Sequence, residues 1–87
     1  MAQVYLIAAF ASTHDAMKAE TLMTRHEIPA RLIPVPPEVS AGCGLALRAL
    51  IEDQAKVAAV LAEAGVTVDF YQLLRDGSKR TVERLEP

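Results

Sequence analysis

Near the start of the chain lies an uninterrupted apolar run, VYLIAAFA, at residues 4–11. A run without polar alternation is typical of a strand that is buried on both faces and is therefore central in a sheet. Only Met-Ala-Gln precedes it, so it lacks the basic segment of a secretory signal peptide, and it is far shorter than the ~20 residues of a membrane span. We therefore predict a central strand in a cytoplasmic protein that does not contact a membrane.

Three later segments have strand-like composition. LALRALI at residues 45–51 is nearly all apolar and indicates a second central strand. The segment at residues 30–35 carries Pro34, which cannot donate to a β-ladder, so it is predicted to be an edge strand. A last strand is predicted over residues 67–74.

Two amphipathic patterns predict helices. The first begins at Ser12 or Thr13, either of which could serve as the N-cap, and runs to about Glu27 before Pro29 ends it. The second covers residues 54–64 and is followed by Gly65, a common helix stop. Residues 75–87 are predicted to form a charged, flexible tail.

The predicted order of elements is β-α-β-β-α-β. Two right-handed crossovers in one sheet give the ferredoxin-like arrangement, an α+β sandwich with a four-stranded antiparallel sheet and both helices on one face. Its first and third strands are central and its second and fourth are edges, which suits the two apolar strands and the proline-bearing one. We therefore predict a single ferredoxin-like domain over residues 1–74.

Composition excludes several classes of protein. The 87 residues are 52% hydrophobic and 23% charged, which supports one packed domain, and the formal charge of −2 argues against binding to nucleic acid. A single cysteine excludes an internal disulfide framework, a CxxC pair and a four-cysteine zinc site.

No Walker loop or dinucleotide fingerprint is present, and His14 and His26 lie too far apart on one helix to share a metal ion. We expect neither a cofactor nor a metal.

The loop at residues 36–44 carries the most distinctive residue, Cys43. In the predicted topology the end of the first strand, the start of the first helix and this loop share one edge of the sheet. Cys43 would then lie near Ser12, Thr13 and His14.

Several effects would favour a thiolate at that position. A helix N-terminus carries a partial positive charge, and a protonated His14 would add to it. Gly42 and Gly44 permit conformations that turn backbone N–H groups inward as an anion nest. Asp15 acts in the opposite direction. We therefore predict a reactive, partly exposed Cys43 supported by these neighbours.

Structural roles compete with each of these assignments. A lone cysteine is usually a small core hydrophobe, and Gly-Cys-Gly can be an ordinary turn. Serine or threonine before a helix is more often a cap than a nucleophile. For Arg31 and Arg48, which lie on strands together with Asp69, a cross-strand charge pair is favoured over an anion site.

Three blocks of the sequence resemble a family of small bacterial selenium/sulfur-carrier-like proteins. The blocks are FASTHDAMKAE at residues 10–20, RLIPVP at 31–36 and SAGCGLALR at 40–48. The family's cysteine falls on Cys43, and its Thr-His-Asp turn on Thr13, His14 and Asp15. The resemblance implies a carrier, not a turnover enzyme, that holds a persulfide or selenopersulfide on Cys43 and exchanges it with donor and acceptor proteins.

Two other functions remain open at this point. The domain could be a ligand-binding or regulatory module, or an interaction subunit in which Cys43 is structural. Because the helices would cover only one face of the sheet, and the first strand offers apolar residues to both, we expect the open face to form a homodimer.

Overall fold

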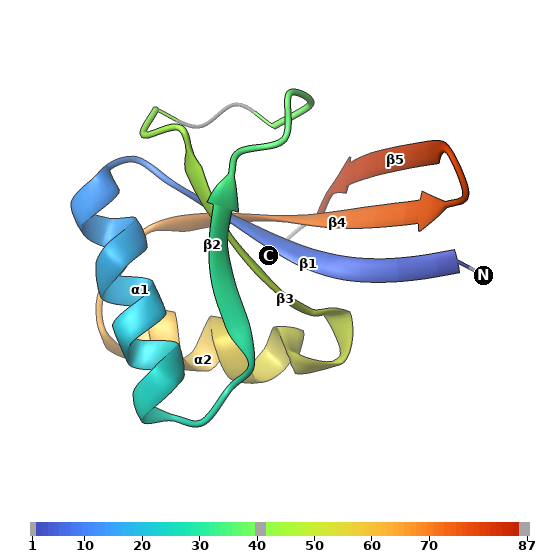
Figure 1. Ribbon diagram of the computed structural model, residues 1–87. Coiled ribbons are helices and arrows are strands. Elements are labelled where there is room, and N and C mark those ends of the chain that lie inside the picture. The colour runs from blue at the N-terminus through green and yellow to red at the C-terminus, as the bar shows by residue number, and fades with distance from the viewer. Residues whose placement is uncertain (1, 40–41, 86–87) are drawn as a thin grey trace.

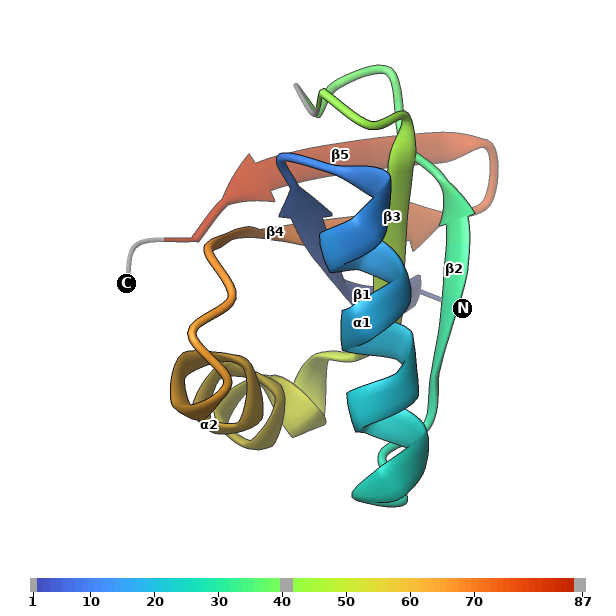
Figure 2. The same cartoon turned by 90° about the vertical axis from the view of Figure 1, so that its left-hand side faces the viewer.

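The computed structural model describes residues 2–39 and 42–85. Its elements are, in chain order, β1 (Ala2–Phe10), α1 (Thr13–Arg25), β2 (Ala30–Pro34), β3 (Leu45–Leu50), the short 3-10 helix η1 (Ile51–Asp53), α2 (Gln54–Glu63), β4 (Val68–Asp76) and β5 (Lys79–Arg84). All five strands form one antiparallel sheet in the order β2-β3-β1-β4-β5, and both helices pack on the same face (Figures 1 and 2). The protein has an α+β fold.

The sequence patterns placed β1 and β3 correctly in the interior of the sheet. β1 lies between β3 and β4, and β3 lies between β2 and β1. β2, which ends at Pro34, is at the edge of the sheet, as its proline requires. α2 ends before Gly65, which has a φ of +72° and lets the Val66 N–H donate to the Leu61 carbonyl in a Schellman arrangement.

The prediction of four strands was wrong, because the segment predicted as a tail contributes a fifth. β4 continues to Asp76 and is joined to β5 by the two-residue turn Gly77-Ser78. Gly77 has a φ of +62°, the left-handed conformation that tight hairpin turns need at their first central position. β4 is therefore an interior strand, and the prediction that it lies at an edge was wrong.

The helix-covered face of the sheet carries the larger core. Even-numbered residues of β1 point toward the helices, because successive side chains of a strand alternate between the two faces. Leu6, Ala8 and Phe10 pack there with residues of α1, β3 and α2, and all three are buried. Among residues 2–39 and 42–85, no helix has both the length and the hydropathy to cross a lipid bilayer.

The opposite face of the sheet is covered by the chain itself. Ile7 and Ala46 are fully buried there, beneath Val39 from the loop after β2, and Val82 of β5 packs against the same cluster. The open apolar face on which the expected homodimer depended is therefore not found in the described residues. The loop after β2 covers this face, and the added β5 extends the sheet and contributes Val82 beside Leu73.

We predict that Val39→Ala destabilises the protein by about 2 kcal/mol, because it removes two buried carbon atoms and leaves a cavity above Ile7. Urea unfolding should show a lower midpoint with an unchanged slope. Val4→Ala, in β1 but outside both core clusters, is the matched control and should cost clearly less. Equal losses in the two variants would show that Val39 is not part of the core.

Candidate functional site

The loop that carries Cys43 connects β2 to β3 and is closed at its base by the backbone. The Val35 N–H donates to the Gly44 carbonyl at 2.9 Å, directly after the last register pair, Pro34 with Leu45. Farther along, the Val39 N–H donates to the Pro36 carbonyl at 2.9 Å. Both Pro36 and Val39 are buried. The loop is therefore closed at its base by one hydrogen bond and held against the fold by two buried side chains.

The Cys43 side chain is partly exposed and packs against the edge of the helix-side core. Its thiol donates to the Leu45 carbonyl at 3.2 Å, and the Leu45 N–H approaches the same sulfur at 3.4 Å. Both contacts are local and hold the sulfur against the start of β3. Cys43 thus combines partial access with a defined position.

Each glycine beside Cys43 has a structural reason to be glycine. A Cβ atom at Gly42 would lie 3.2 Å from the Ala11 carbonyl oxygen, so the loop approaches the end of β1 closely there. Gly44 has a φ of +75° with open space around it, so glycine is favoured there by the backbone conformation and not by a lack of space. Neither observation depends on an anion nest, and among the described contacts no loop N–H other than that of Leu45 donates to the sulfur.

The structure brings the loop to the end of β1 that the topology predicted. Gly42 faces Ala11, the residue before Ser12, and a small hollow of about 220 Å³ separates Gly42 from the start of β4. Figure 2 shows the loop at the same end of the molecule as the start of α1. Ser12 is the N-cap of that helix and accepts the Asp15 N–H at 3.1 Å. Thr13 and His14 are exposed in its first turn.

No described hydrogen bond joins Cys43 to Ser12, Thr13 or His14. His26 is exposed at the other end of α1, at its C-cap. In the part of the chain that the structure describes, no three His, Cys, Asp or Glu side chains gather as a metal site would require.

An ion pair that sequence reasoning missed ties the loop to β5. Arg80 donates through Nε and Nη2 to the two carboxylate oxygens of Glu38, at 3.0 and 2.9 Å. Forty-two positions separate these residues in the sequence, so no local pattern could have indicated the pair. Bidentate arginine–carboxylate pairs are geometrically specific, and this one fixes the loop beside Val39.

The predicted charge pair between Asp69 and Arg31 or Arg48 is wrong. Asp69 accepts a hydrogen bond from Arg84 of β5 at 2.9 Å, a strand that the prediction did not include. Arg31 and Arg48 are instead directly opposite each other on β2 and β3.

Comparison with known proteins identifies the family. A family model described as "Putative Se/S carrier protein-like" matches residues 5–72. The chain belongs to this family. The match runs from β1 into β4 and includes the Cys43 loop, whereas β5 and Arg80 lie outside it, and the resemblance seen in the three sequence blocks is confirmed. No curated protein and no solved structure matches the chain.

We predict that Arg80→Gln increases the alkylation rate of Cys43 by up to about fivefold. A partly exposed ion pair contributes up to about 1 kcal/mol. Its loss lowers the free energy needed to open the loop by up to that amount, which corresponds to a rate increase of up to about fivefold. Mass spectrometry after timed exposure to iodoacetamide measures the rate.

Two further variants make this test specific. Glu38→Gln should have the same effect as Arg80→Gln, and the double variant should add nothing, because both changes break one interaction. Arg84→Gln breaks an ion pair of equal length on the same strand but outside the loop, and should leave the rate unchanged. A rate that responds equally to Arg80→Gln and Arg84→Gln would rule out the loop anchor.

Proposed function

We propose that this protein carries sulfur or selenium as a persulfide or selenopersulfide on Cys43. The observation that carries the proposal is the placement of the chain's single cysteine, partly exposed on an anchored loop, in a member of this family. A carrier needs one accessible thiol and no neighbouring thiol that could displace its cargo as an internal disulfide.

Loading is a transfer of one sulfur atom that needs no external oxidant. The Cys43 thiolate attacks the terminal sulfur of a persulfide on a donor protein, and a new S–S bond forms as the donor's S–S bond breaks. The donor cysteine leaves with the electron pair as a thiolate, and the transferred atom remains on Cys43 as a persulfide. Selenium follows the same path when the terminal atom of the donor is selenium.

The Leu45 backbone affects this chemistry in two ways. Its N–H lies 3.4 Å from Sγ and stabilises negative charge on the sulfur. Its carbonyl oxygen, 3.2 Å from Sγ, accepts from the neutral thiol but repels an anion. The N–H and the carbonyl thus act in opposite directions on a charged sulfur, and loading exchanges the contact with the carbonyl for the new S–S bond partner.

A second candidate function has its own support. Cys43 packs against the helix-side core and its thiol donates to the backbone at the start of β3, as a structural cysteine can. In that case the domain is a non-catalytic binding or regulatory module, and a serine at position 43 would preserve its function.

The deciding experiment is intact-mass spectrometry after incubation with a cysteine desulfurase and cysteine. We expect a gain of one sulfur atom that dithiothreitol removes. Selenocysteine in place of cysteine should give a gain of one selenium atom, because the same transfer step applies.

Cys43→Ser and Cys43→Ala should both fold, as judged by circular dichroism, and neither should gain mass. Free sulfide without the desulfurase should not load the wild-type protein, since sulfide supplies no sulfur at the required oxidation level. A folded wild-type protein whose Cys43 reacts with iodoacetamide but gains no sulfur would overturn the carrier proposal and favour the binding module.

A further inference from the structure

Charge is distributed unevenly over this molecule despite its small net value. The register of the strands places five of the six arginines on the helix-free face of the sheet. They are Arg31, Arg48, Arg75, Arg80 and Arg84. This basic face lies opposite the helices, so it is separate from the core against which Cys43 packs.

Two pairs of these arginines face each other directly across neighbouring strands. Arg75 of β4 is opposite Arg80 of β5, and Arg31 of β2 is opposite Arg48 of β3. Like charges in directly opposed positions destabilise a sheet. An anion between or beside each pair would remove that cost.

The first pair has its anion within the chain. Glu38 accepts two hydrogen bonds from Arg80 and so supplies a carboxylate to the Arg75–Arg80 pair. For Arg31 and Arg48 no carboxylate lies within ion-pair distance among residues 2–39 and 42–85. Both pairs are directly opposed across antiparallel strands, but within the described residues the Arg31–Arg48 pair lacks a carboxylate such as that of Glu38.

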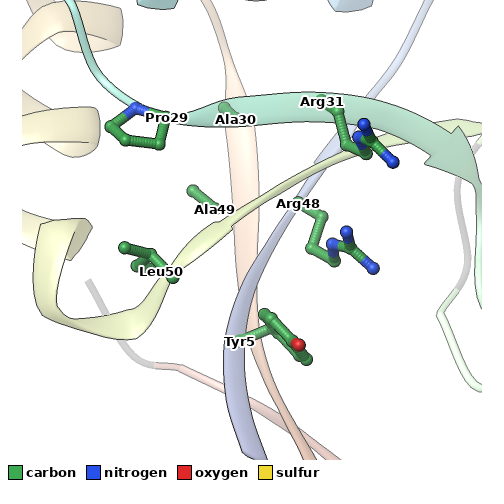
Figure 3. A pocket seen from close by; sticks show the side chains of 7 residues that line it. All are labelled: Tyr5, Pro29, Ala30, Arg31, Arg48, Ala49 and Leu50. Carbon is green, nitrogen blue, oxygen red and sulfur yellow. The ribbon is translucent and has the colours of Figure 1, made fainter.

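The surroundings of Arg31 and Arg48 form a shallow groove of about 500 Å³. Figure 3 shows both arginine side chains extending in the same direction from β2 and β3, with Tyr5 of β1 beside them. The Arg48 guanidinium lies over the Tyr5 ring, 4.9 Å from its centre, which holds Arg48 in place. Leu50, one of two large hydrophobic side chains that are exposed in the described residues, also lines the groove, as does Pro29.

We propose that this groove binds a phosphate monoester. The phosphate group would lie between Arg31 and Arg48, and the organic group would rest against Tyr5 and Leu50. A phosphate monoester carries close to two negative charges at neutral pH, which matches the two guanidinium groups, and arginine binds its oxygens in pairs. The proposal goes beyond the carrier function and does not involve Cys43.

The test is a titration of the isotope-labelled protein with phenyl phosphate, followed by amide and arginine Nε chemical shifts. Saturable shifts are expected at Tyr5, Arg31, Arg48 and Leu50. Inorganic phosphate should shift the arginines with weaker affinity, because it lacks the apolar group. Shifts confined to residues 42–45, or no saturable shift in the groove, would overturn the proposal.

Variants separate this site from general attraction of anions. Arg31→Gln and Arg48→Gln should each weaken phenyl phosphate binding about tenfold. Arg31→Lys should fall between them and the wild type, because lysine keeps the charge but loses the paired donors. Arg25→Gln on α1 should bind normally, as should Cys43→Ser, which keeps this test independent of the carrier proposal. A loss in Arg25→Gln equal to that in Arg31→Gln would also overturn the proposal.

Thermal stability provides a second test, because the difference between the wild type and Arg31→Gln should change sign between chloride and phosphate. In chloride, Arg31→Gln should unfold at the same temperature as the wild type or higher, since it removes a like-charge contact. In phosphate at equal ionic strength, the wild type should gain more than the variant, because binding stabilises the folded state. Equal gains in wild type and variant would show that phosphate acts only through the solvent.

Discussion

Burial of β1 on both faces is the constraint on which the rest of the structure depends. Leu6 and Ile7 are neighbours that point to opposite sides of the sheet, and both are fully buried. The two helices cover one side, while Val39 of the loop after β2 and the Val82 side chain of β5 pack on the other. The loop that carries Cys43 is therefore part of a core. Val39 is buried in the same cluster as Ile7, so this loop contributes to the stability of the sheet.

Much of the fold could be predicted because the decisive signals are local. The apolar runs identified two of the three interior strands, β1 and β3, and Pro34 identified an edge. β5 also had a local signal, the Asp-Gly-Ser turn at residues 76–78, but the high charge of the residues after it suggested a solvated tail. The charge is tolerated because β5 lies at the edge of the sheet, where Val82 is the residue that contacts the core. At this edge, one apolar side chain on the helix-free face is the contact that β5 makes with the core.

The candidate site was predictable in its location and not in its contacts. Topology alone brings the loop to the end of β1, and Gly42 does approach Ala11. The hydrogen-bond partner of Cys43 is Leu45 and not the start of α1, because the sulfur packs toward β3. The anchor between Glu38 and Arg80 depends on a strand that was not expected. Such contacts depend on register and on distant segments, which composition and spacing do not specify.

The net charge likewise does not predict where charges gather on the folded surface. A formal charge of −2 is a sum over the chain, whereas a ligand meets the local field of one surface. Arginines separated along the chain, such as Arg31 and Arg48, become neighbours only when the strands pair in register. The chain compensates the Arg75–Arg80 pair with Glu38 and holds Arg48 against Tyr5. The remaining repulsion between Arg31 and Arg48 is small beside the burial of β1, so the fold can hold two like charges together on its surface.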